Sequence, residues 1–342
     1  MNKEITLHNS SEFQNSTITD RFGRVFNYLR IAINESCNLR CIYCMPEEGI
    51  LFQEKDRLLD KNEICKIIKV MSELGVSKIR FTGGEPLLRK DLLDLIQYTY
   101  QETDISSIHL TTNGVLLPKY INQLVKAGLN GINISLDTLN KEKFKKITRR
   151  EELENVLEGL DLAICSGIKS IKVNMVVMKG FNNDEITDFV ELTKNNDITV
   201  RFIELMPFDS HQIWKTGKFY SADRIVNDLR SHYRTLSPVK GSATEYYIFK
   251  IKEYAGRVAV IPSYTRSLCS ACNRIRVTAD GNLLNCLYSR SETNMRDAIR
   301  NGMKNEGLKN LIVGSMQKKL KDGLIAQNHG NDLRDSMTQI GG

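Results

Sequence analysis

Short apolar runs alternate with longer amphipathic stretches between residues 29 and 206. Each apolar run has the length of a buried strand, and most are followed by a stretch with apolar residues at helical spacing. Residues 60–74 illustrate the helical half of the unit, because Asp60 is suited to cap a helix and Gly75 to end it. Strands are predicted at residues 29–34, 77–83, 107–114, 131–137, 171–178 and 199–206, and helices at 60–74, 91–100, 119–128, 151–165 and 184–194.

This alternation predicts the α/β class. Strands linked by crossover helices form a parallel sheet, and the six repeating units predict a partial (β/α)6 barrel of the TIM type. Polar and glycine-containing segments follow several of the strands, at the edge where barrel enzymes place their active sites. The pattern changes after residue 208. The expected division is therefore a flexible lead-in at 1–20, the barrel at 21–208, a C-terminal subdomain at 209–330 and a tail at 331–342.

Composition narrows the expected partners and compartment. The formal net charge of +7 suits an anionic ligand, but no dense Lys/Arg stretch with interleaved aromatic residues occurs, so no nucleic acid partner is expected. No run of about 18 apolar residues and no signal-peptide pattern occurs, so no membrane partner is expected and the protein is predicted to be cytoplasmic. Thiols stay reduced in the cytoplasm, where spaced cysteines indicate a metal site more often than a disulfide.

Three cysteines form a C-x3-C-x2-C motif after the first predicted strand: Cys37, Cys41 and Cys44. Three thiolates on one loop can bind three irons of a 4Fe-4S cluster, which leaves the fourth iron open for a cofactor or substrate. The alternative is a structural zinc site, which usually needs four ligands, and no fourth Cys or His lies near this loop. The motif therefore favours a catalytic cluster.

A second set with C-x2-C-x13-C spacing lies near the end of the chain: Cys269, Cys272 and Cys286. It predicts a second cluster carried by the C-terminal subdomain, while zinc with a fourth ligand such as His329 and a redox-active cysteine pair remain alternatives. Arg274 and Arg276 lie between these cysteines, and in an extended segment both point to one face. Two guanidinium groups suit a polyphosphate, although a solvated edge strand is equally compatible with this pattern.

The first motif, with Tyr43 just before its last cysteine, resembles the signature of the radical S-adenosylmethionine (SAM) superfamily. The resemblance extends to residues 83–86, a Gly-Gly-Glu-Pro motif at the end of the second strand. In that superfamily the motif holds the amino group of SAM. Gly83 and Gly84 would let the backbone approach the ligand, and Glu85 would accept from the ammonium. Without the resemblance, these residues predict only a turn between a strand and a helix.

Nearly the whole chain is similar to the GTP 3′,8-cyclase family of molybdenum cofactor biosynthesis. The motifs that carry the similarity lie at residues 20–24, 28–30, 41–46, 81–89, 135–138, 201–207, 272–276 and 337–342. The resemblance implies that SAM binds the first cluster and yields a 5′-deoxyadenosyl radical, which removes the 3′ hydrogen of GTP. Attack on C8 of guanine would then give 3′,8-cyclo-7,8-dihydro-GTP. A second 4Fe-4S cluster would hold the guanine, and Gly341 and Gly342 would enter the active site.

The resemblance also implies roles for single residues. Catalytic roles fall to the first cysteine set together with Arg274 and Arg276. The expected SAM contacts are Tyr43, Gly83, Gly84, Glu85, Ser135 and Met206. The expected GTP contacts are Arg30, Arg80, Thr111, Lys172, Arg201, Arg274 and Arg276. A separate cyclic pyranopterin monophosphate synthase would receive the product, while the electron donor is unspecified and a homodimer is left open. Two alternatives remain, another radical SAM enzyme such as one that modifies a peptide, and a non-catalytic zinc-binding module.

Overall fold

One sheet of twelve strands organises the part of the chain that the computed structural model describes, which is residues 17–46, 49–206, 216–241, 247–265, 269–288, 291–327 and 337–340. The strands are β1 (Tyr28–Ala32), β2 (Lys78–Thr82), β3 (Ser107–Thr112), β4 (Gly131–Ser135), β5 (Ser170–Val177), β6 (Thr199–Glu204), β7 (Leu236–Pro238), β8 (Tyr247–Ile251), β9 (Arg257–Ile261), β10 (Arg274–Val277), β11 (Asn282–Leu284) and β12 (Glu292–Asn294). Their order is β12-β11-β10-β1-β2-β3-β4-β5-β6-β9-β8-β7. Every neighbouring pair from β10 to β9 is parallel.

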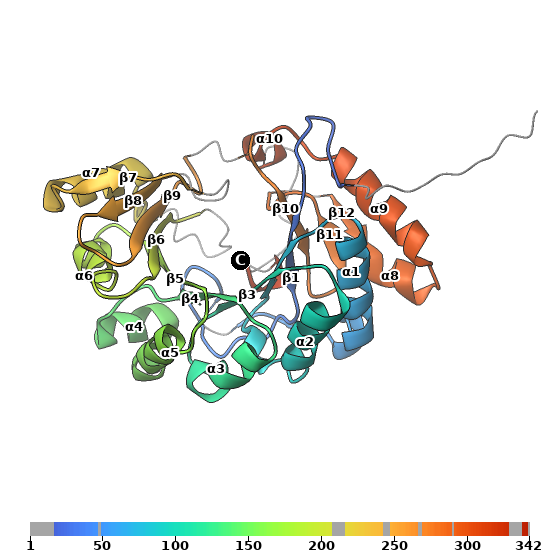
Figure 1. Cartoon of the computed structure of the whole chain (residues 1–342), viewed down its shortest axis with the longest axis horizontal. Helices are drawn as coiled ribbons and strands as arrows, with labels where there is room; N and C mark the ends of the chain where they lie inside the picture. The colour runs from blue at the N-terminus through green and yellow to red at the C-terminus, as the bar shows by residue number, and fades with distance from the viewer. Residues whose placement is uncertain are drawn as a thin grey trace, which may run out of the picture.

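The sheet is curved, and most of the helices lie on its convex side (Figure 1). The helices are α1 (Lys61–Glu73), α2 (Leu92–Glu102), α3 (Leu117–Lys126), α4 (Lys141–Thr148), α5 (Leu153–Cys165), α6 (Ile186–Glu191), α7 (Ala222–His232), α8 (Met295–Arg300), α9 (Asn305–Gln317), α10 (Gly323–Gln327) and α11 (Met337–Ile340). The predicted α/β class with a partial barrel is confirmed, and its six predicted strands correspond to β1 to β6.

Helix α1 forms where the sequence predicts it because its ends are fixed locally. Asp60 accepts from the Glu63 amide at 2.8 Å, and the Glu63 carboxylate accepts from the Asp60 amide at 2.8 Å, which completes a capping box. At the other end Gly75 has a φ of +82°, a left-handed conformation that terminates the helix. Between them Ile64, Ile67 and other apolar residues are buried against the sheet.

Helix α4 is absent from the sequence prediction. Four of its eight residues are lysines, so the apolar periodicity is weak. Tertiary packing nevertheless forms the helix, because Phe144 and Ile147 are buried and the Asn140 side chain accepts from the Lys143 amide at 3.0 Å. The sequence prediction also contains no helix after the last cysteines, where the structure has α8, α9, α10 and α11.

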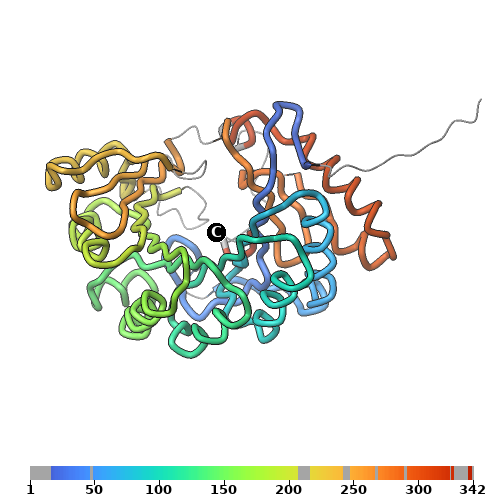
Figure 2. Tube along the Cα trace, in the orientation of Figure 1, coloured from blue at the N-terminus to red at the C-terminus, as the bar shows by residue number. Residues whose placement is uncertain are grey.

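Strands from the C-terminal part extend both edges of the barrel sheet. β10 pairs with β1, and β9 pairs with β6, both in parallel. The Cα trace in Figure 2 shows the orange segment that contains β10 beside the blue segment that contains β1. Residues 207–215, which span the predicted boundary at residue 208, lie outside the described residues. The boundary stays a prediction, but strands from both sides of it share one sheet.

The predicted flexible lead-in ends in ordered structure. Ile18 is fully buried in the core, and Thr19 forms an antiparallel bridge with Val25. Residues 1–16 lie outside the described residues.

None of the helices described here is both long enough and apolar enough to cross a bilayer.

Candidate active site

A continuous cavity occupies the concave side of the sheet. Its larger part is lined by the first cysteine set and by strands of the barrel, and its smaller part by the second cysteine set. The two parts share the lining residues Met206, Ile261, Ser263, Arg274, Arg276 and Leu287. The two cysteine sets, far apart in the chain, therefore face one space, with both arginines at the junction.

The first cysteine set lies on the loop that follows β1. Cys37, Cys41 and Cys44 are partly buried and line the larger part of the cavity. The Leu39 amide donates to Cys37 Sγ at 3.4 Å, and the Cys44 amide donates to the Cys41 carbonyl at 2.9 Å. Burial raises the pKa of Cys37 and of Cys41, so these thiols keep their protons until a metal takes the proton's place.

Two glycines allow this loop to lie directly against the end of β2. A Cβ on Gly83 would come within 2.3 Å of the Asn34 carbonyl oxygen, and one on Gly84 within 2.2 Å of the Ser36 carbonyl oxygen. The two backbones are hydrogen-bonded there, since the Gly84 amide donates to Asn34 at 3.0 Å and the Glu85 amide to Ser36 at 2.7 Å. The glycine pair is therefore required by the packing of the cysteine loop, a reason that the sequence does not indicate.

Glu85 is fully buried and is not among the residues that line the cavity. Its carboxylate accepts hydrogen bonds from Leu87 N at 3.0 Å, Thr112 Oγ1 at 2.7 Å and Asn113 N at 2.7 Å. Burial raises its pKa to about 7 despite these donors. Asn113 in turn donates to Cys37 Sγ at 3.7 Å. In the structure Glu85 is thus a positioning residue, and the direct SAM contact predicted for it stays a prediction.

Asp137 is a second buried carboxylate, and it does line the cavity at the end of β4. It accepts from the Tyr43 hydroxyl at 2.7 Å and from the Val176 amide at 2.8 Å. These bonds join the cysteine loop to the ends of β4 and β5. Burial raises the pKa of Asp137 to about 6.

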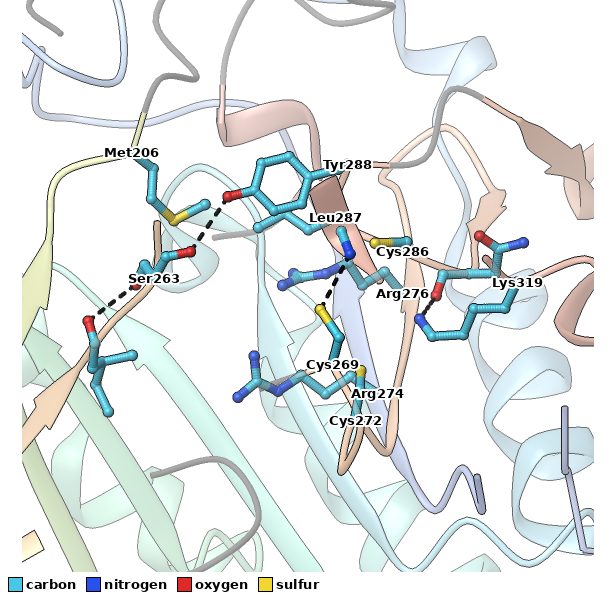
Figure 3. Close-up of a pocket in the computed structure, with 13 residues that line it drawn as sticks. Met206, Ser263, Cys269, Cys272, Arg274, Arg276, Cys286, Leu287, Tyr288 and Lys319 are labelled. Atoms are coloured by element: carbon cyan, nitrogen blue, oxygen red, sulfur yellow. Dashed lines mark hydrogen bonds between the residues drawn. The ribbon is translucent and has the colours of Figure 1, made fainter. Parts of the chain in front are cut away.

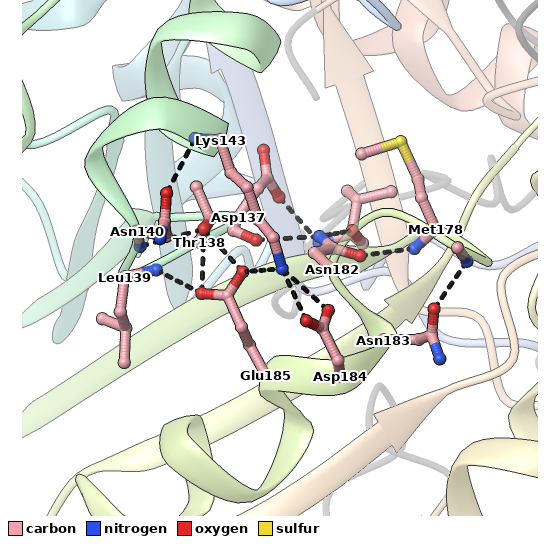
Figure 4. Close-up of polar contacts among 12 residues, drawn as sticks. Asp137, Thr138, Leu139, Asn140, Lys143, Met178, Asn182, Asn183, Asp184 and Glu185 are labelled. Carbon is pink, nitrogen blue, oxygen red and sulfur yellow. Dashed lines mark hydrogen bonds and ion pairs between the residues drawn. The ribbon is translucent and has the colours of Figure 1, made fainter.

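A polar network behind Asp137 fixes the loop on which it lies (Figure 4). The Asn182 amide group donates to the Asp137 carbonyl at 2.8 Å, and its oxygen accepts from the Met178 amide at 2.7 Å. The Glu185 carboxylate accepts from the Thr138 hydroxyl at 2.7 Å. Because these groups are buried and satisfied by one another, the Asp137 carboxylate is held in one position.

Basic side chains lie side by side on neighbouring strands of the sheet. Arg30 on β1 is opposite Arg276 on β10 and opposite Arg80 on β2. Arg274 and Arg276 both line the cavity, as the alternation of an extended segment predicts. The buried Nε atoms of Arg30 and Arg80 and the Thr111 hydroxyl have no hydrogen-bond partner in the described part of the chain. Such buried polar atoms indicate a site built for a polar ligand.

The crowding of these cations changes their acid–base behaviour. Burial, together with neighbouring cations, lowers the pKa of Arg80 and of Arg276 to about 9. Burial alone would raise the pKa of Tyr28, but Arg80, Arg30 and Arg274 lower it to about 7. A positive field of this strength favours the entry of an anion.

Two further predicted GTP contacts differ in their placement. Arg201 lines the cavity and donates through Nε and NH2 to Asn174 Oδ1 at 2.8 and 2.6 Å. Lys172 lies on β5, between Asn133 on β4 and Thr199 on β6, and is not among the lining residues. Its role toward GTP stays a prediction.

The second cysteine set surrounds the smaller part of the cavity (Figure 3). The Gly323 amide donates to Cys269 Sγ at 3.2 Å. Burial would raise the pKa of Cys272, but Lys319, Arg274 and Arg276 lower it below its usual value. These surroundings favour the thiolate form that a metal requires.

The Arg24 side chain contacts the second cysteine loop through a hydrogen bond to its backbone. Its guanidinium is buried against Asp20, with Nε 2.6 Å from Oδ2. It also donates to the carbonyl oxygens of Cys269 at 2.8 Å, Leu320 at 2.8 Å and Lys321 at 2.9 Å. Residues 20–24 carry part of the family resemblance, but the sequence predicts no role for them. In the structure, Arg24 from this segment, paired with Asp20, makes the contact with the second cysteine loop.

Most predicted site residues line the cavity. Those in its larger part are Arg30, Cys37, Cys41, Tyr43, Cys44, Arg80, Gly83, Gly84, Thr111, Ser135, Arg201, Met206, Arg274 and Arg276. His329, Gly341 and Gly342 lie outside the described residues. The lining residues Asn113 and Asp137 lie in polar segments that follow predicted strands, where the sequence places functional groups. Lining residues without a predicted role include Asn174, Glu204, Thr338 and Lys319, and nothing in the sequence marks Lys319.

Known proteins resemble this chain in both parts of the site. Residues 31–193 match the family described as Radical SAM superfamily, and residues 198–324 match Molybdenum Cofactor Synthesis C. A GTP 3′,8-cyclase of Chlorobaculum tepidum is 44% identical over 325 residues, which are 95% of this chain and 97% of that protein. Molybdenum cofactor biosynthesis protein 1 of Bos taurus is 45% identical over 304 residues, which are 88% of this chain and 48% of that longer protein.

A solved structure shares the fold. Streptococcus suis SuiB bound to precursor peptide SuiA has a TM-score of 0.60 at 17% identity, covering 86% of this chain and 67% of that chain. The fold and the first cysteine loop are thus those of a radical SAM enzyme, a class that uses SAM and a 4Fe-4S cluster. Given the similarity along nearly the full length of the Chlorobaculum protein, the chain belongs to the GTP 3′,8-cyclase family.

The residues of the first cysteine loop fit these cofactors. Its three thiols line one cavity, and Asp137 places a carboxylate there that suits the positive charges of SAM. In the described part of the chain, no three His, Cys, Asp or Glu side chains form a group suited to a single metal ion. A 4Fe-4S cluster needs no such group, because each thiolate binds a different iron.

Proposed function

We propose that this chain is a GTP 3′,8-cyclase with a 4Fe-4S cluster on each cysteine set. One observation carries the proposal: both sets face a single cavity, and Arg274 and Arg276 lie where its two parts meet. A ligand bound at this junction would contact residues near both cysteine sets at once. A non-catalytic zinc module has no need of this arrangement.

When bound, SAM and the first cluster supply a 5′-deoxyadenosyl radical that removes the 3′ hydrogen of GTP, and ring closure onto C8 with one further electron and a proton gives 3′,8-cyclo-7,8-dihydro-GTP. Tyr43, Gly83, Gly84, Ser135 and Met206 bind SAM in this proposal, and Glu85 orders the strand ends beside it. Asp137 holds Tyr43 and adds negative charge opposite the SAM cation.

The basic side chains bind and orient the triphosphate. Arg30, Arg80, Arg201, Arg274 and Arg276 line the cavity, with Thr111 as a further donor. Lys172 acts on the same anion from β5 through its charge. A ribose fixed at one end by its phosphates and at the other by its base has little freedom to turn, which orients the 3′ hydrogen.

The second cysteine set holds the guanine end through its cluster. Cys269, Cys272 and Cys286 would supply three thiolate ligands to a 4Fe-4S cluster, and the remaining iron would be available to a ring atom of the substrate. The proposal places the reaction in the cytoplasm, where thiols stay reduced. An outside donor supplies the electrons, a cyclic pyranopterin monophosphate synthase receives the product, and a homodimer is left open.

The decisive experiment follows one hydrogen atom. The protein is purified without oxygen, reconstituted with iron and sulfide, and given SAM, dithionite and GTP deuterated at C3′. We expect deuterium in the 5′-deoxyadenosine, detected by mass spectrometry together with the cyclic product. Joint replacement of Cys37, Cys41 and Cys44 by Ala should abolish both products. Unlabelled deoxyadenosine with intact GTP would refute GTP as the hydrogen donor and favour another radical SAM substrate such as a peptide.

A binding measurement tests the basic side chains separately. Joint replacement of Arg274 and Arg276 by Ala should weaken GTP binding at least tenfold, since each removes a charge-assisted contact worth more than about 1 kcal/mol. Iron content should stay at the parent value. Unchanged GTP affinity would remove the phosphate role from both arginines.

A further inference from the structure

Lys319 is a buried lysine beside the second cysteine set. It follows α9, and its side chain is 3% exposed. Its ammonium donates to the Asn285 carbonyl and lies 5.4 Å from the centre of the Phe26 ring. Within the described residues, Lys319 forms no ion pair with a carboxylate. A buried ammonium is costly unless an anion compensates it.

The protein groups around Lys319 do not supply that anion. Lys319 lines the smaller part of the cavity with all three cysteines of the second set (Figure 3). Two arginines line the same space, and no Asp or Glu is among its lining residues. The groups there that can carry negative charge are thiolates and whatever they bind.

Neighbouring contacts fix the position of Lys319. Arg24 holds the carbonyl oxygens of the next two residues, Leu320 and Lys321, as well as that of Cys269. The Asn285 side chain donates to the Ser315 carbonyl on α9 at 3.2 Å, which joins the helix to the residue before Cys286. These contacts hold the Lys319 ammonium in the wall that it shares with the cysteines.

We propose that Lys319 is the counter-ion of an iron–sulfur cluster on Cys269, Cys272 and Cys286 and that its charge raises the reduction potential of that cluster. The inference rests on the second cluster of the proposed function. Reduction adds negative charge to the cluster, and a fixed positive charge nearby in a water-poor site stabilises the reduced form more than the oxidised form. Lys319 is a positioning and electrostatic residue here, because it need not touch the substrate.

The test isolates the second cluster. In the full chain, Cys37, Cys41 and Cys44 are replaced by Ala, and the iron that remains is titrated with reductant and followed by electron paramagnetic resonance without GTP. Lys319→Met should shift the potential to a more negative value. Lys319→Arg keeps the charge and should keep the potential close to the parent value. Lys318→Met, at an exposed neighbouring position, is the matched control and should change nothing.

Each result decides the question. Full iron with an unchanged potential in Lys319→Met overturns the inference. Loss of iron in Lys319→Met, with iron retained in Lys319→Arg, supports it, because the charge is then needed to hold the cluster. Loss of iron in both variants, with a native circular dichroism spectrum, overturns the inference, because the packing of Lys319 and not its charge would then be needed for cluster binding. If the background chain itself holds no iron, the second cluster is refuted and the counter-ion role falls with it.

Discussion

The two cysteine sets face the same cavity from opposite electrostatic surroundings. The first set lies beside buried carboxylates. Burial, with the negative charge of Glu85, raises the pKa of Cys37, and burial with that of Asp137 raises the pKa of Cys41. This end of the cavity favours a cation, and SAM carries both a sulfonium and an ammonium group.

The second set lies beside buried cations. Lys319, Arg274 and Arg276 lower the pKa of Cys272 even though burial opposes them. This end favours thiolates, which suits a cluster. One cavity can thus bind a positive cofactor and a negative substrate next to each other, because it contains both buried carboxylates and buried cations.

The two loops also differ in what holds them. The first is fixed by backbone packing, in which glycines at the end of β2 admit residues 34–36. The second is held partly by a side chain, because Arg24 donates to the Cys269 carbonyl and ties it to the carbonyls of Leu320 and Lys321 after α9. Each end should therefore be open to selective disruption.

The largest effect is expected from Gly84→Ala. The added Cβ would lie 2.2 Å from a backbone oxygen of the cysteine loop, so the loop must move. We expect loss of the first cluster, about half of the iron if both sites hold cubanes, and no 5′-deoxyadenosine. Iron per chain and deoxyadenosine formation are the measurements. Gly314→Ala on α9, where a Cβ meets nothing within 4 Å, is the control. Normal iron and turnover in Gly84→Ala would contradict the packing argument.

Arg24→Ala should affect the second cysteine set instead of the first. It removes a buried ion pair with Asp20 and leaves that carboxylate uncompensated, which costs about 3–5 kcal/mol of stability. Iron should be lost from the second site, while SAM cleavage at the first continues without GTP turnover. Denaturant unfolding and iron content measure the two effects. Arg21→Ala, at an exposed position, should leave both unchanged. Equal loss from the two cysteine sets would show that Arg24 does not act selectively.

A smaller effect is expected from pH on the metal-free protein. Burial raises the pKa of Glu85 from 4.5 to about 7, so between these values the folded chain binds a proton that the unfolded chain releases. The contribution of Glu85 to stability is full below about pH 4.5 and declines as pH rises toward 7, by about 3 kcal/mol.

Urea unfolding at several pH values tests this dependence. Glu85→Gln should flatten the slope even though it lowers stability overall, because an amide cannot accept from all three donors. Glu142→Gln, at an exposed position on α4, should keep the parent slope. A slope unchanged in Glu85→Gln would place the titrating group elsewhere.

Local sequence determined much of the fold. The Asp60 cap, the Gly75 terminus and the six apolar runs predict α1 and the strands β1 to β6, because caps and periodicity act within a few residues. Helix α4 escaped prediction since its lysines hide a short apolar face that only packing reveals. The helices after β12 were also absent from the sequence prediction.

The sequence by itself also determined the chemistry of the site, since two sets of three cysteines and the Gly-Gly-Glu-Pro motif depend only on residue type and spacing. The tertiary structure alone decided how these parts meet. Pairing of β10 with β1 places Arg276 beside Arg30, although the two residues are far apart in the sequence. Folding also buried Glu85 behind the lining residues Thr112 and Asn113 and placed Lys319 in the cavity wall. Such placements follow from long-range packing of the sheet, which no local pattern encodes.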